Sequence, residues 1–137
     1  MTMANPMTIF DVAGRAMSAQ LVRMNSSASN LANAGSIAGD ANAVYKPINP
    51  VFRTELDRST GMMSVSVDRV VRSDAQAIRR HDPDHPLADE NGDVWAAPVD
   101  ETQEMVEMME SARQYQNVIE VLQTTKTLML DTMRLGK

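Results

Sequence analysis

Apolar and small residues recur every three or four positions between residues 8 and 33, which is the spacing of one face of an α-helix. Thr8 and Asp11 have the spacing of a capping box, so we expect the helix to begin there. Gly35 follows the last apolar position and predicts the helix end. The larger apolar residues of this stripe are seven residues apart, as in a coiled-coil seam: Phe10, Met17, Met24 and Leu31.

A second, longer helical pattern starts near Asp100 and continues to the end of the sequence. Asp100 and Gln103 have the spacing of a capping pair, and acidic residues fill the first turns, as the helix dipole favours. About 35 residues at 1.5 Å each predict a helix roughly 50 Å long. We expect its apolar stripes to contact the first helix or neighbouring molecules through Met105, Met109, Tyr115, Ile119, Leu122, Met129 and Met133.

The region between the helices, residues 36–99, has a different pattern and contains five of the six prolines. GMMSVSVDRVV alternates around Val65 and Val67, which predicts a strand, and DVWAA predicts a shorter one. VYKPINPVF is an extended stretch interrupted by proline, and HDPDHPLADENGD is a polar turn region. We therefore expect two or three short strands connected by long loops.

Together these patterns predict a mainly α fold with a small β insert, in which long N- and C-terminal helices pair as a coiled-coil-like bundle. We expect residues 1–35 and 100–137 to form a terminal helical domain that serves assembly. We expect residues 36–99 to form a β-rich middle region between the two helices.

Composition suggests a thin core for a chain of this length. Among 137 residues there are two Phe, two Tyr and one Trp, against twelve Met. Aromatic side chains bury the most area, whereas methionine is flexible, so we expect part of the stability to come from partners.

Charge and residue usage exclude several classes of function. The net charge is −5 and no basic patch is present, which argues against nucleic-acid binding. The absence of cysteine excludes disulfides, thiolate catalysis and cysteine-based zinc sites. No apolar stretch approaches the roughly 18 residues of a membrane span, and no positive segment precedes an apolar run as in a cleaved signal peptide. We therefore expect no membrane span.

Metal binding and catalysis have little support in the sequence. His81 and His85 have helical metal-ligand spacing, but the prolines between and after them forbid a regular helix, and a polar surface turn is the simpler interpretation. DENGD resembles part of an EF-hand loop, yet the aligned ligand positions fall on Leu87 and Pro98. No nucleophile motif or phosphate loop stands out. We expect no enzyme activity, no cofactor and no metal.

Two amides stand at the end of the first helix, in SNLANA at residues 29–34. Asn is a mediocre helix former, so Asn30 and Asn33 need another reason to be there. An amide carries both donors and an acceptor, and small neighbours allow close approach. We expect these amides to pair with helix-end carbonyls or with neighbouring chains, as part of the assembly interface together with Leu31.

Four stretches together resemble the flagellar basal-body rod proteins of the rod and hook axial family, and most closely the proximal rod proteins. They are SNLANA, YKP at residues 45–47, HDPDHPLADENGDV at 81–94, and the terminal stretch from EMVEMMESARQYQ to LGK at 104–137. The family usually has aromatic residues at the positions of His81 and Asp93, and asparagine at that of Val118.

The resemblance implies a structural subunit of the proximal rod that polymerises through its terminal helices into a helical drive shaft transmitting motor torque. It implies as partners the neighbouring proximal and distal rod proteins, copies of the chain itself, and the flagellar type III export apparatus. It implies export from the cytoplasm without a cleaved signal, and a location in the basal body where the rod crosses the periplasm. The alternative is a soluble helical chaperone that grips client helices with its methionine-rich face.

Overall fold

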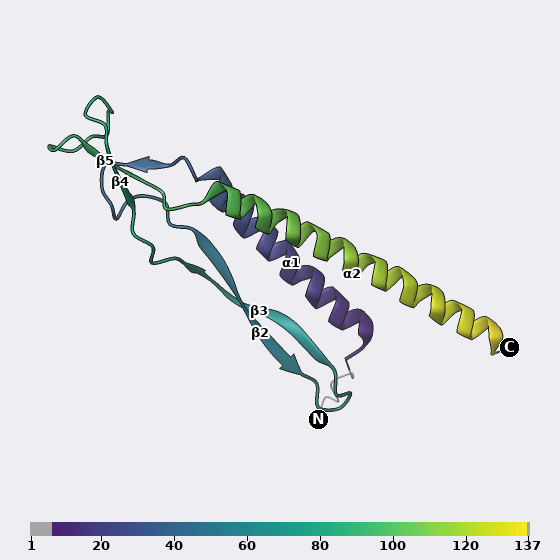
Figure 1. Ribbon diagram of the computed structural model, residues 1–137. Coiled ribbons are helices and arrows are strands. Elements are labelled where there is room, and N and C mark those ends of the chain that lie inside the picture. The colour runs from purple at the N-terminus through teal and green to yellow at the C-terminus, as the bar shows by residue number, and fades with distance from the viewer. Residues whose placement is uncertain (1–6, 137) are drawn as a thin grey trace.

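A computed structural model describes residues 7–136, which form two helices and five strands (Figure 1). Helix α1 spans Ile9–Ala32 and helix α2 spans Glu101–Leu135. The strands between them are β1 (Ile37–Ala38), β2 (Ile48–Leu56), β3 (Met63–Arg72), β4 (Ile78–His81) and β5 (Asp93–Ala96). Residues 1–6 and Lys137, which belong to the predicted terminal helical domain, lie outside the described residues.

Both helices begin at the predicted caps. The Thr8 hydroxyl accepts a hydrogen bond from the Asp11 N–H at 3.2 Å, and the Asp11 carboxylate accepts one from the Thr8 N–H at 2.9 Å. This is a complete capping box. The Asp100 carboxylate accepts from the Gln103 N–H at 3.1 Å. The predicted helix starts are confirmed, and α2 has the expected length of 35 residues.

The strands of the described chain form two antiparallel sheets. Strands β2 and β3 pair with each other as a hairpin, while β5 lies between β1 and β4 in a three-stranded sheet. The hairpin contains a β-bulge, because Val51 pairs with Arg69 and Phe52 with Val67, which leaves Asp68 as the extra residue.

The middle region has more strand than the sequence patterns predicted. The predicted strands around Val65 and in DVWAA are present as β3 and β5. However, β2 and β3 have nine and ten residues instead of being short. Strands β1 and β4 were not predicted, because β1 has only two residues and β4 reads IRRH, which has no apolar alternation.

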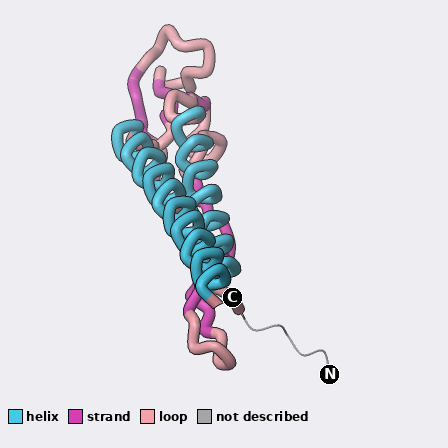
Figure 2. The backbone as a smooth tube through the Cα atoms, turned by 90° about the vertical axis from the view of Figure 1, so that its right-hand side faces the viewer, coloured by secondary structure: helices cyan, strands magenta, loops and turns pink. Residues whose placement is uncertain are grey.

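Helix α1 is the central element of the fold. It contacts α2 along one side and both strands of the hairpin along another. Figure 1 shows the hairpin and α2 on opposite sides of α1, and Figure 2 shows the two helices side by side with the strands behind them. The packing of α1 on α2 agrees with the predicted pairing of the helices. A coiled-coil geometry for that pair remains a prediction.

The core consists of small side chains. The buried apolar residues of the described chain are alanines, valines and one proline: Ala13, Ala19, Val44, Pro47, Val94 and Ala97. The methionines of residues 7–136 are half-buried or exposed, and none belongs to this fully buried set. Small residues let the backbones of α1, α2 and the hairpin approach closely, and the larger apolar groups are left nearer the surface. No helix in the described range is long and apolar enough to cross a membrane.

Candidate assembly interface

Asn30 is a buried polar hub that joins four segments of the chain. Its side chain is fully buried, and its amide nitrogen donates to the Ile48 carbonyl and to the Glu104 carboxylate, both at 3.0 Å. Its amide oxygen accepts from the Ile48 N–H and from the Tyr45 hydroxyl, both at 2.8 Å. All four hydrogen-bonding positions of the amide are therefore used inside one chain, which fixes α1 against β2 and α2.

Asn33 performs the local role that the sequence suggested. Its side-chain nitrogen donates to the Ser29 carbonyl at 2.8 Å, and its backbone N–H lies within 3.2 Å of both the Ser29 and Asn30 carbonyls. The side-chain amide thus adds a second donor to the Ser29 carbonyl at the end of α1. The predicted pairing with helix-end carbonyls is confirmed for Asn33, whereas Asn30 uses its amide on more distant parts of the same chain.

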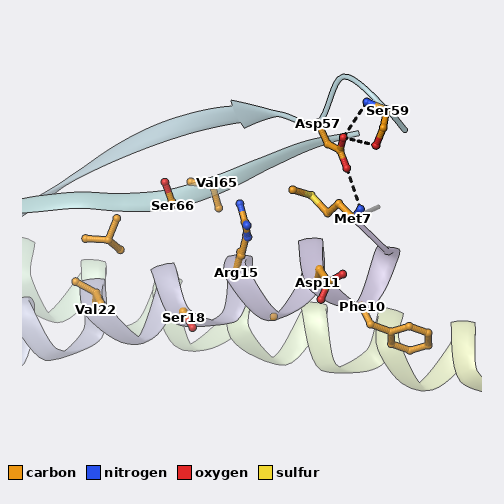
Figure 3. A pocket seen from close by; sticks show the side chains of 12 residues that line it. Met7, Phe10, Asp11, Arg15, Ser18, Val22, Asp57, Ser59, Val65 and Ser66 are labelled. Carbon is orange, nitrogen blue, oxygen red and sulfur yellow. Dashed lines mark hydrogen bonds between the residues drawn. The ribbon is translucent and has the colours of Figure 1, made fainter. Parts of the chain in front are cut away.

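A second set of polar contacts fastens the hairpin to the start of α1. Arg15 donates to the Glu55 carboxylate at 2.6 Å and to the Ser64 hydroxyl at 3.0 Å. The Asp57 carboxylate accepts the backbone N–H of Met7 at 2.8 Å (Figure 3). Between these contacts lies an open groove of about 950 Å³, whose walls are α1 and the hairpin.

The two hairpin carboxylates are held in their charged form. The Ser59 hydroxyl, the Met7 N–H and the Ser59 N–H all donate to Asp57 and hold the pKa of its carboxyl well below the ordinary value. Hydrogen bonds from Arg53, Ser66 and Arg15 lower the pKa of Glu55 in the same way. Both carboxylates are therefore ionised at neutral pH and keep their hydrogen bonds to Arg15 and to the Met7 N–H at the start of α1.

The contact between α1 and α2 combines one ion pair with small side chains. Arg23 donates to the Glu107 carboxylate at 2.6 Å, and Ser111 is fully buried with its hydroxyl bonded to the Glu107 carbonyl at 2.7 Å. Within residues 7–136, no buried side-chain nitrogen or oxygen lacks a hydrogen-bond partner. Near the start of α2, the buried polar groups between the two helices therefore all have hydrogen-bond partners.

The predicted interface residues fall into three groups. Those half-buried in the structure are Met17, Met24, Leu31, Asn33, Tyr115, Ile119 and Leu122. Those exposed are Phe10, Met105, Met109, Met129 and Met133. Asn30 alone among them is fully buried.

Sequence reasoning missed several exposed apolar residues and the partners of Asn30. Leu21 and Leu128 belong to the apolar stripes of the sequence but were not included in the predicted interface, whereas Leu130 and Leu135 lie off those stripes on the same helix as Leu128. The partners of Asn30, which are Tyr45, Ile48 and Glu104, are 15 to 74 residues away in sequence, and no local pattern indicates them.

His81 contacts Asp93 across two neighbouring strands, and Arg79 forms an ion pair with the same carboxylate. His81 Nδ1 lies 2.9 Å from Asp93 Oδ1, and Arg79 Nε lies 3.1 Å from Asp93 Oδ2. His81 and Asp93 are direct partners in the β4–β5 register. The two positions at which the chain departs from the aromatic pattern of the rod family therefore face each other. Among the described residues, no group of three His, Asp or Glu could hold a metal ion.

The end of α2 projects beyond α1. The two helices have 35 and 24 residues, and the Arg23–Glu107 pair places the start of α2 beside the second half of α1. The remaining turns of α2 extend past the first turn of α1, and Figure 1 shows this end alone (yellow). It carries five exposed large apolar side chains, which are Leu128, Met129, Leu130, Met133 and Leu135. Such a contiguous apolar surface is typical of an interaction site.

The sequence of this chain is similar to those of known proteins. The family model described as flagellar basal body rod FlgEFG protein C-terminal matches residues 90–135, which include β5 and α2. The flagellar basal-body rod protein FlgC of Salmonella typhimurium is 42% identical over 131 residues, which cover 96% of this chain and 98% of the relative. The FlgC proteins of Escherichia coli O157:H7 and Agrobacterium fabrum are 40% and 31% identical, and the matches cover 96% and 92% of this chain.

These similarities define the class as flagellar basal-body rod proteins. Within that class, the chain belongs to the FlgC family. The comparisons give no support to the alternative of a chaperone.

Proposed function

We propose that this chain is a structural subunit of the bacterial flagellar basal-body rod, and of its proximal part. The observation that carries the proposal is the identity of 40–42% with FlgC proteins over nearly the whole of both chains. Two capped helices with apolar side chains left exposed support the same function, because a subunit that polymerises needs contact surfaces beyond those that hold its own fold.

The mechanism we propose is polymerisation through the terminal helices. Subunits that contact each other through two different surfaces form an open helical assembly when the rotation between them does not close a ring. The helices α1 and α2 supply such surfaces, since each keeps an exposed side after packing on the other. The partners are other rod subunits and copies of this chain, with delivery by the flagellar type III export apparatus, at a location where the rod crosses the periplasm.

Torque transmission requires that a force applied to one element reaches the others. The Asn30 hub supports this role, because it links α1 to both β2 and α2 through hydrogen bonds of 2.8 to 3.0 Å. A fully satisfied buried network fixes one arrangement of the segments that it joins. The Arg15 and Asp57 contacts hold the hairpin to the other end of α1. We propose no catalytic role for any of these groups.

Deleting the gene and following rod formation tests the proposal. We expect cells without this chain to be non-motile and to lack complete rods in isolated basal bodies, and a copy of the gene supplied in trans to restore both. A tagged copy that restores motility should be recovered in the isolated basal bodies. Normal motility and complete rods in the deletion strain would contradict the proposed function.

A further inference from the structure

Helix α1 has an exposed face without any charge. Its exposed residues, apart from Ile9, Asp11 and Arg15, lie within an arc of about 80° when residues are placed at 100° intervals around the helix. We call this arc the α1 face; it consists of Phe10, Gly14, Ser18, Leu21, Asn25, Ala28 and Ala32. The solvent side of a surface helix is normally rich in charged residues, so an uncharged and largely small-residue side is unusual.

Two of the three charged residues of α1 point to its other sides, and the third, Asp11, lies at the edge of the α1 face and forms the capping box with Thr8. Arg15 reaches the hairpin and Arg23 reaches α2, so these two contacts mark the two sides that are covered within the subunit. Figure 3 shows Arg15 directed toward the hairpin and Phe10 pointing away from it. Phe10 and Leu21 are the two large side chains of the α1 face and are 42% and 43% exposed. The face therefore combines two apolar projections with small residues that allow another backbone to approach.

The projecting end of α2 continues the stripe by which α2 packs on α1. Ser111, Tyr115, Leu122, Met129 and Met133 follow one another at intervals of four and seven residues, which keeps them on one side of the helix. Along this line the exposure rises from 0% at Ser111 to 47% at Met129 and 68% at Met133. The stripe keeps its apolar character, but α1 is too short to cover its end.

We propose that the projecting end of α2 in one copy packs against the α1 face of a second copy of this chain. This inference rests on the proposed function and specifies which surfaces of the subunit meet. The continuity of the stripe argues for an α1 helix as the occupant, because the same line of side chains already packs on α1 within the subunit. A second copy supplies an α1 helix whose α1 face is exposed.

Shape agrees with this pairing. The projecting end has an open hollow of about 400 Å³ lined by Thr125, Leu128, Met129, Thr132 and Met133. A large apolar side chain such as Leu21 of the second copy can enter a hollow of this size. The two surfaces are different and lie on different helices, so the contact is heterologous and can repeat without closing.

Cysteine cross-linking in assembled rods tests the contact, because the natural chain contains no cysteine. Two single variants, Leu21→Cys and Met129→Cys, would be made together in the deletion strain, with an epitope tag on one so that the mixed disulfide is identified by its mass. A disulfide forms only when the two Cα atoms lie within about 7 Å. We expect mild oxidation of isolated basal bodies to give the mixed disulfide.

The matched control pairs Leu21→Cys with Met109→Cys. Met109 is 67% exposed and belongs to the same helix, but it lies on the side of α2 opposite to Ser111 and Met129. We expect several-fold less mixed disulfide from this pair. Equal cross-linking by both pairs, or none from Leu21→Cys with Met129→Cys in rods that contain both variants, would overturn the inference while leaving the proposed function intact.

A charge-introducing variant provides a second measurement. In Met129→Glu/Met133→Glu, two carboxylates replace exposed side chains, so the purified monomer should keep its melting temperature, as most surface substitutions do. Its incorporation into basal bodies should fall several-fold relative to Thr127→Glu, whose exposed position lies on the opposite side of α2. Equal incorporation of the two variants would count against the contact. Failure to find even the unaltered chain in basal bodies would instead contradict the proposed function.

Discussion

The amide nitrogen of Asn30 donates to the carboxylate of Glu104 at 3.0 Å, and this bond ties the end of α1 to the beginning of α2. The same amide holds both backbone groups of Ile48 at the start of β2. One buried side chain therefore sets the positions of α1, β2 and α2 relative to one another. Its removal should affect the stability of the free subunit before it affects any contact between subunits.

Replacing Asn30 by leucine should destabilise the monomer. The substitution leaves the N–H and carbonyl of Ile48 and the carboxylate of Glu104 without their partner, and one unpaired buried group costs about 1–3 kcal/mol. The free energy of unfolding, measured by urea denaturation followed by circular dichroism, should fall by at least this amount. Asn33→Leu is the control and should lose less, because only the Ser29 carbonyl depends on that side chain. Equal losses would argue against the hub.

Asp57 should make the stability of the subunit sensitive to acid. Its pKa is lowered in the folded chain by the Ser59 hydroxyl and the Met7 and Ser59 N–H groups, so its contribution is complete above its ordinary pKa of 3.8 and disappears as pH falls below that value. The difference in unfolding free energy between the natural chain and Asp57→Asn should therefore shrink between pH 5 and pH 2. Asp84→Asn, at an exposed turn position, should show no comparable trend.

Two glycines should respond to alanine in opposite directions. Gly92 has φ +76°, and an added Cβ would lie 3.0 Å from Pro83 Cγ and 3.1 Å from His81 Cε1. Gly92→Ala should therefore lower the melting temperature, with a cost above about 1 kcal/mol. Gly14 lies inside α1 with nothing near its Cβ position, so Gly14→Ala should stabilise the monomer by about 0.5–1 kcal/mol. Thermal unfolding of both variants measures these changes, and a shift of the same sign in both would contradict this account.

The facing pair His81 and Asp93 should show energetic coupling. Because they are cross-strand partners, replacing either one by tyrosine removes the hydrogen bond between the His81 imidazole and the Asp93 carboxylate. Replacing both restores a matched aromatic pair, and such cross-strand pairs contribute about 0.2–1 kcal/mol. We expect the double variant to lose less stability than the sum of the two single variants. A double-mutant cycle by denaturant unfolding checks this, and additive losses would show that the two positions are independent.

Local sequence patterns were sufficient for the helices. The pairs Thr8–Asp11 and Asp100–Gln103 marked both helix starts, because a cap is made by residues three positions apart. The alternation around Val65 was sufficient for β3. Strand β4 escaped prediction because its residues are polar and its pairing with β5 joins residues that are 12 to 18 positions apart.

The candidate interface was predicted less completely than the helices. The spacing of Met129 and Met133 identified an apolar stripe, but only the lengths of α1 and α2 together show that this part of the stripe lies beyond α1. Asn30 was singled out because asparagine is a mediocre helix former and this one lies within the predicted helix. Its partners required the fold, since a contact with Glu104 spans 74 residues and has no local signature.

The residues of the Asn30 hub emerge in a fixed order when the chain is synthesised from its N-terminus, and this order determines when the hub can form. Asn30 comes first, Tyr45 and Ile48 follow soon after, and Glu104 arrives only when about three quarters of the chain has emerged. Until Glu104 has emerged, α1 cannot form its hydrogen bond with α2. The hub is therefore completed late, and a chain halted midway lacks the hydrogen bond that ties α1 to α2.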